Sequence, residues 1–100
     1  MTNFYVVYDA FLAKMLDDEW ANWYEDYILE DWKSLLMSAI PWFKFPRVSL
    51  EVSEDEDAFI DDLNNEEVQI LATYMKCEWL NRTILTWENI KPLYEERDFS

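Results

Sequence analysis

Hydrophobic residues recur at helical spacing in the first part of the chain. Between residues 4 and 15 they stand three and four positions apart, so they share one stripe of a helix. The stripe consists of Phe4, Val7, Tyr8, Phe11, Leu12 and Met15. This spacing predicts a helix over about residues 4–17 whose apolar stripe faces the core.

A second helix is predicted over about residues 23–40. Asn22 is a suitable N-cap, and Glu25 follows three residues later, which is the spacing of a capping box. Pro41 lacks a backbone donor and disfavours helical geometry at the preceding residue, so the helix should end or kink there. Its inner face carries Ile28, Trp32, Leu35, Leu36, Ala39 and Ile40.

The segment over residues 41–63 has a different pattern. Two prolines rule out a regular helix over residues 41–52, while Val48, Leu50 and Val52 alternate with polar residues, as in an extended segment. The following stretch, Ser-Glu-Asp-Glu-Asp over residues 53–57, contains no basic residue. We therefore predict an extended arm followed by a solvated acidic linker that charge repulsion keeps out of the core.

A third helix is predicted over about residues 65–85, because Asn64 and Glu67 repeat the capping-box spacing. Its apolar face is wide and comprises Val68, Ile70, Leu71, Tyr74, Met75, Trp79, Leu80 and Ile84. A helix that is apolar over more than a third of its circumference packs between other elements or contacts a neighbouring chain.

Residues 86–100 are predicted to form a short helix or tail. Thr86 can cap a helix that begins at Trp87, and Pro92 forces such a helix to stop or restart near residue 91. Together the segments predict one all-α domain over residues 1–100. It is a small bundle of three to four helices with an extended arm or loop between helices 2 and 3.

The composition adds an unusual surface to this fold. Asp and Glu outnumber Lys and Arg by 22 to 8, for a net charge of −14, yet 51% of the residues are hydrophobic and 18% are aromatic. A disordered acidic segment is poor in aromatic residues, so the charge belongs to a folded protein. So many aromatic side chains exceed what a 100-residue domain readily buries, and we expect some to face a partner.

Several chemistries are not expected. Histidine and glycine are absent, which removes the commonest general base and metal ligand as well as any Gly-rich phosphate loop. The single cysteine, Cys77, fits a reducing compartment and has no histidine to activate it. We expect no cofactor and no metal, and the chain is predicted not to be an enzyme. Neither a signal peptide nor a membrane span is expected from the sequence.

Two stretches resemble a known family. Residues 38–47 read SAIPWFKFPR at the end of a helical hairpin, and residues 67–82 read EVQILATYMKCEWLNR after a polar connection. This order resembles the small α-helical head–tail connector proteins of tailed bacteriophages. In that family a helix that closes on an aromatic residue followed by Asn-Arg packs on an earlier helix that ends in a loop. The resemblance covers most of residues 5–99.

The resemblance implies a structural virion protein, made in the bacterial host cytoplasm and located in the neck between head and tail. Such an adaptor forms a ring, typically a dodecamer of twelve copies, below the portal and above the next neck or tail protein, and it extends the DNA channel. Aromatic and Arg side chains are the usual anchors of interfaces. The predicted subunit or portal interface comprises Trp42, Phe43, Phe45, Arg47, Trp87, Tyr94 and Phe99.

The acidity agrees with a DNA conduit. A channel wall of Asp and Glu repels phosphates, so that DNA slides through without specific binding and without the affinity that Lys and Arg create. The acids predicted to face the channel are Glu54, Asp55, Glu56, Asp57, Asp61 and Asp62.

Two other classes of protein remain open. One is an acidic DNA mimic that inhibits a DNA-binding host protein, because its sequence also combines helices with high negative charge. The concentration of acids between residues 51 and 67 disfavours it, since a mimic spreads its carboxylates along helix faces. The other is a different assembly or interaction protein.

Overall fold

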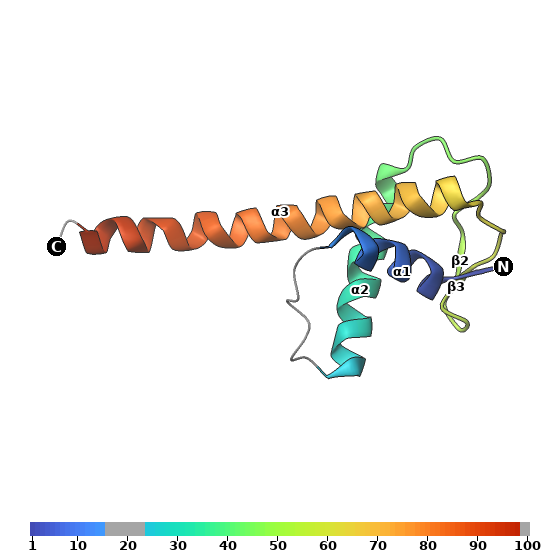
Figure 1. Ribbon diagram of the computed structural model, residues 1–100, viewed down its shortest axis with the longest axis horizontal. Helices are drawn as coiled ribbons and strands as arrows, with labels where there is room; N and C mark the ends of the chain where they lie inside the picture. The colour runs from blue at the N-terminus through green and yellow to red at the C-terminus, as the bar shows by residue number, and fades with distance from the viewer. Residues whose placement is uncertain (16–23, 99–100) are drawn as a thin grey trace.

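The chain is mostly helical, and a small antiparallel sheet stands at one end (Figure 1). The computed structural model describes residues 1–15 and 24–98, and the side chains of residues 1–15 and 24–86. Its elements are β1 (Thr2–Asn3), α1 (Phe4–Lys14), α2 (Glu25–Ala39), the 3-10 helix η1 (Ile40–Trp42), β2 (Val52–Ser53), β3 (Ala58–Phe59) and α3 (Asn65–Asp98). The molecule measures 57 × 31 × 23 Å because α3 extends well beyond the other elements.

The first predicted helix is confirmed as α1, which begins at Phe4 and ends at Lys14. The Asn3 side chain accepts a hydrogen bond from the Tyr5 backbone N–H at 2.9 Å and so caps the first turn. At the other end the Lys76 ammonium donates to the Lys14 carbonyl at 3.0 Å. The helix is shorter than predicted because Met15 is already extended, and residues 16–17 lie outside the described residues.

The second predicted helix is confirmed as α2, which begins at Glu25 and ends at Ala39. The predicted cap Asn22 lies outside the described residues, and Tyr24 occupies the N-cap position without a side-chain hydrogen bond. Pro41 lies at the start of η1, so the helix tightens into a 3-10 turn where the proline was expected to end it.

The expected all-α class is confirmed only in part, because the described residues are mostly helical but also include a three-stranded antiparallel sheet in the order β1-β3-β2. Thr2 and Asn3 pair with Phe59 and Ala58 on one side of β3, and β2 pairs on the other side. Each strand contains only two residues, and a strand this short is not recognisable from alternating polar and apolar residues in the sequence.

The predicted acidic linker folds into the hairpin that joins β2 to β3. Residues 54–57 form its exposed turn, in which the Glu56 backbone N–H donates to the Ser53 carbonyl at 3.3 Å. Asp57 takes the left-handed conformation, with φ of 48°, which Asp tolerates better than most residues other than glycine. The four acids stay outside the core as predicted, but Ala58 and Phe59, which belong to the predicted linker, are buried.

The capping box at the start of α3 is confirmed. The Asn64 side chain accepts from the Glu67 N–H at 2.8 Å, and the Glu67 carboxylate accepts from the Asn64 N–H at 2.9 Å. The predicted end near residue 85 is wrong, because one helix continues through Pro92 to Asp98. Thr86 does not cap a new helix; its hydroxyl donates back to the Arg82 carbonyl at 2.9 Å.

The core forms where α1, α2 and the sheet pack on the N-terminal half of α3. Its most buried members are Phe4, Val7, Phe11, Leu36, Ala39, Phe59, Leu71, Ala72 and Met75. Burying one such large side chain contributes roughly 1.5–3 kcal/mol. This small core holds the three helices and the sheet in one unit and leaves the rest of α3 projecting.

Candidate functional site

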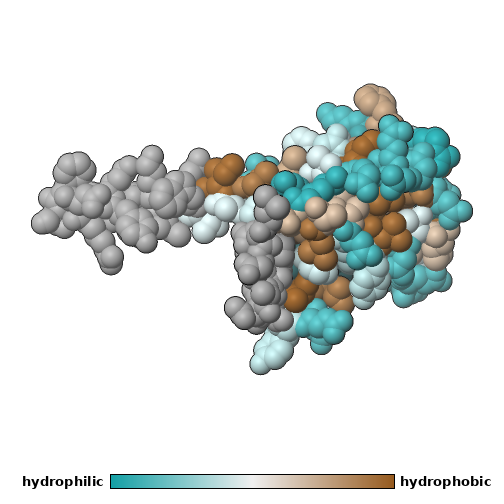
Figure 2. Space-filling view, viewed as in Figure 1, coloured by the Kyte–Doolittle hydropathy of each residue, from teal (hydrophilic) through white to brown (hydrophobic). Residues whose placement is uncertain are grey.

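The most prominent surface feature is the part of α3 that leaves the body. Leu80, Ile84 and Leu85 expose 41%, 52% and 60% of their surface, although Leu80 and Ile84 belong to the apolar face predicted to pack on other elements or on a neighbouring chain. Figure 2 shows hydrophobic surface where α3 emerges from the body. The backbone of α3 continues to Asp98, about 24 Å beyond Arg82 at 1.5 Å per residue. An apolar stretch on a projecting helix indicates a surface that a partner covers.

The arm after α2 places its aromatic side chains in three different environments. Phe45 is 91% exposed and Trp42 is 55% exposed, and the Trp42 indole Nε1 donates to the Glu78 carboxylate on α3 at 2.5 Å. Phe43 turns inward, where its ring lies 6.5 Å from that of Tyr74. Within the predicted interface of the arm, Phe45 is thus the aromatic side chain most available to a partner.

Arg47, also predicted at the interface, binds within the chain. Its Nη2 donates to the Glu67 carboxylate at 3.1 Å and to the Asp62 carbonyl at 3.3 Å. The Asn64 backbone N–H, followed by the Arg47 guanidinium, lowers the pKa of the Glu67 carboxyl below its ordinary value. Arg47 therefore ties the arm to the start of α3, while more than half of its side chain stays exposed.

The six acids predicted to face a channel are not equivalent. Glu54, Asp55 and Glu56 are exposed on the hairpin turn, and no described residue forms an ion pair with them. Asp57 accepts from the Lys33 ammonium at 2.8 Å, Asp62 pairs with the N-terminal amine, and Asp61 is half-buried. The N-terminal amine lowers the pKa of Asp62, and the hydrogen bond to Asp57 raises that of Lys33.

The rest of the predicted interface lies near the end of the chain. Trp87 and Tyr94 belong to the projecting part of α3, and Phe99 lies outside the described residues. The structure adds a pair that the sequence did not single out, Tyr24 and Tyr27, which are 79% and 60% exposed with ring centroids 6.1 Å apart. The two tyrosines stand three positions apart among acidic residues at the start of α2. Residues at this spacing are neighbours on a helix surface, so the sequence could have indicated an exposed aromatic pair.

Within the described part of the chain, no group of three or more Cys, Asp or Glu side chains is arranged to hold a metal ion. None of the helices over the described residues is long and apolar enough to span a membrane. Comparison with known proteins finds no matching family model, no matching curated protein and no matching solved structure.

Proposed function

We propose that this chain is a structural subunit of a bacteriophage head–tail connector, an adaptor that forms a ring below the portal and extends the DNA channel. The observation that carries the proposal is the projecting part of α3, with Leu80, Ile84 and Leu85 exposed in succession. A subunit in a closed ring meets a neighbour on each of two sides, so a heterologous interface buries two different patches of every subunit, and an exposed apolar stretch suits one of them.

The exposed arm supports the same function. Trp42 ends η1, and Phe45 follows on an irregular segment that the core does not enclose. The hydrogen bonds of Trp42 to Glu78 and of Arg47 to Glu67 hold this part of the chain against α3. An anchored segment with exposed aromatic side chains loses little conformational entropy when it docks, which favours an interface.

The exposed hairpin turn supports a channel-facing role. Glu54, Asp55 and Glu56 lie on an exposed turn whose base is held by the pairing of β2 with β3. If copies in a ring point this turn inward, the wall carries rings of carboxylates that repel DNA phosphates. The passage of DNA then requires no specific contact with the protein.

Native mass spectrometry of the purified chain, alone and with a portal protein, tests the proposal. We expect closed rings near twelve copies, on the portal if not in isolation. The opposite result has two parts. The chain stays a monomer or dimer that never joins a portal, and it binds a basic DNA-processing enzyme with an affinity that falls as salt rises. This result would identify a DNA mimic and overturn the connector proposal.

Phe45→Ala tests the arm within this assembly. The side chain is 91% exposed, so the variant should keep the stability of the monomer while weakening ring formation severalfold. Tyr5→Ala, which changes an exposed aromatic residue on α1, is the matched control. Equal ring formation by the wild type, Phe45→Ala and Tyr5→Ala would show that Phe45 does not contribute to the interface.

A further inference from the structure

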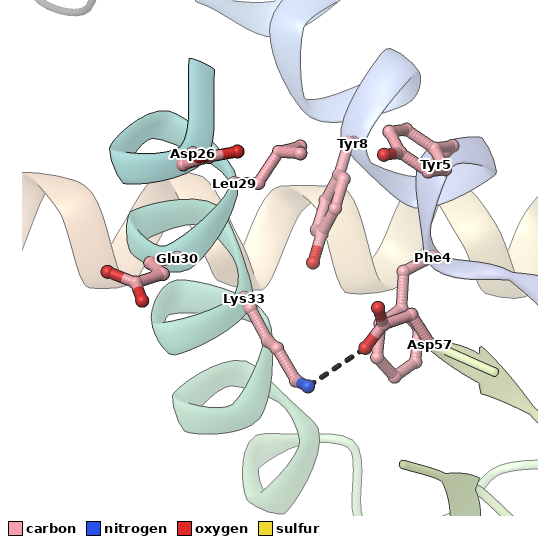
Figure 3. A pocket seen from close by; sticks show the side chains of 8 residues that line it. All are labelled: Phe4, Tyr5, Tyr8, Asp26, Leu29, Glu30, Lys33 and Asp57. Carbon is pink, nitrogen blue, oxygen red and sulfur yellow. Dashed lines mark hydrogen bonds and ion pairs between the residues drawn. The ribbon is translucent and has the colours of Figure 1, made fainter. Parts of the chain in front are cut away.

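A pocket of about 230 Å³ opens between α1, α2 and the hairpin turn (Figure 3). Phe4, Tyr5 and Tyr8 of α1 form one wall, and α2 forms the other. The volume lies below the roughly 300–1,000 Å³ of pockets that hold whole small molecules. The size therefore suits a single side chain of a partner.

Tyr8 places an unused polar group inside this pocket. Its side chain is 4% exposed, and the hydroxyl group points between Lys33 and Asp57 (Figure 3). No described residue forms a hydrogen bond with this hydroxyl group. Burial, followed by the charge of Asp57, raises the pKa of the Tyr8 hydroxyl well above its ordinary value, so the group stays neutral and keeps its lone pairs as acceptors.

The charges around the pocket are unbalanced. Asp26, Glu30 and Asp57 line it together with one cation, Lys33, which leaves a net charge of −2. Lys33 is bound to Asp57, whereas no described residue forms an ion pair with Asp26 or Glu30. Both residues belong to α2, and Figure 3 shows the Asp26 carboxylate turned toward the side of Tyr8, whereas the Glu30 carboxylate points to the other side of the helix.

From this arrangement we propose that the pocket binds the guanidinium group of an arginine on a basic segment of a partner protein. The aromatic wall suits the planar group by stacking and cation–π attraction, and the Asp26 carboxylate suits its forked donors. The Tyr8 hydroxyl accepts one further hydrogen bond. A basic partner, rather than a second copy, matches a chain of net charge −14, because unlike charges favour encounter.

The probe is a short peptide with one arginine, acetyl-Ala-Arg-Ala-amide, added to the full chain at low salt and followed by NMR. We expect weak, saturable binding that shifts the amide resonances of α1 and α2 around Tyr8, Asp26 and Glu30. The same peptide with citrulline keeps the shape but has no charge, and it should not bind. Equal shifts from citrulline, or from lysine in place of arginine, would overturn the guanidinium site.

Two variants separate binding from folding. Tyr8→Phe keeps the ring and removes the hydroxyl group, and Asp26→Asn removes the carboxylate turned toward the pocket; each should weaken the binding of the arginine peptide about threefold or more. Glu56→Gln changes an acid on the exposed hairpin turn and is the matched control. If Glu56→Gln weakens binding as much as Asp26→Asn, the peptide responds to net charge alone and the pocket is not the site. This outcome is independent of ring assembly, which native mass spectrometry reports separately.

Discussion

At the scale of single residues, the start of α3 depends on Asn64 and Glu67, which bind each other's backbone N–H groups. This site was predictable because a capping box is local and its residue types and spacing are sufficient to indicate it. The hydrogen bond that Arg47 adds to the Glu67 carboxylate was not predictable. It approaches from 20 residues away, and the path of the arm between them decides the contact.

The cap gives a first stability prediction. Asn64→Ala removes the acceptor of the Glu67 N–H and should lower the free energy of unfolding by about 1 kcal/mol. Asn65→Ala, one position later at the first residue of α3, is the matched control and should change it much less. Urea unfolding followed by circular dichroism measures both. Equal losses in the two variants would contradict the capping role.

Glu67 gives a prediction about pH. Its pKa in the folded chain is lowered, so below its unfolded value of roughly 4.3 the unfolded state binds the extra proton first. The stability that the carboxylate contributes is therefore complete above that pH and is lost as the pH falls through the folded pKa. The stability difference between wild type and Glu67→Gln, measured by urea unfolding from pH 7 to pH 3, should shrink in this acid range. Glu66→Gln removes the same charge from the exposed neighbouring residue as the control.

At the scale of elements, the three helices were predictable from their apolar periodicity, whereas the sheet was not. Ala58 and Phe59 stand between acids in the sequence, and their burial results from pairing with Thr2 and Asn3 far away in the chain. The continuation of α3 through Pro92 was missed for another reason. A proline inside a helix costs about 3 kcal/mol, and for that reason a break was predicted at Pro92. Starting a new helix after the proline requires a costly nucleus, and the continuous α3 avoids that cost.

The sheet leads to a prediction that distinguishes a core strand from a solvated linker. Phe59 is fully buried and its ring lies 5.2 Å from that of Phe4, so Phe59→Ala should destabilise the chain by about 3–5 kcal/mol. Ile60→Ala changes the next residue, which is 45% exposed, and should have a small effect. Thermal unfolding of the pair provides the measurement. A Phe59→Ala variant as stable as Ile60→Ala would mean that β3 does not belong to the core.

At the scale of the whole molecule, the body buries most of its apolar side chains, whereas the described start of the projecting helix exposes Ile84 and Leu85. The predicted class of protein, a subunit of a larger assembly, rests on aromatic and aliphatic residues in excess of what the core holds. The sequence did not show which of these residues stay exposed. That depends on the point along α3 at which the contacts with α2 end, and the packing of the two helices decides this point. Arg82, which binds Asp31 of α2 through two hydrogen bonds of 2.6 and 3.1 Å, marks that end.

Ile84 tests the projecting helix. Ile84→Ser removes an apolar side chain that is 52% exposed, so it should leave the unfolding transition of the monomer nearly unchanged and weaken self-association severalfold. Analytical ultracentrifugation over a range of concentrations measures the effect. Val6→Ser, an equivalent change on α1 at 47% exposure, should associate like the wild type. Association that survives Ile84→Ser undiminished would place the interface elsewhere.

The pairing of β1 with β3 also dictates the order in which the chain folds. Thr2 pairs with Phe59, so during synthesis Thr2 and Asn3 find their partners only after residues 4–59 have been made. The core closes only after Leu71 and Met75 of α3 have emerged as well. Contacts this distant in sequence slow the search for the native state, because a long loop must close before it is stabilised. During synthesis the buried face of α1 therefore lacks part of its packing until the N-terminal half of α3 has been made.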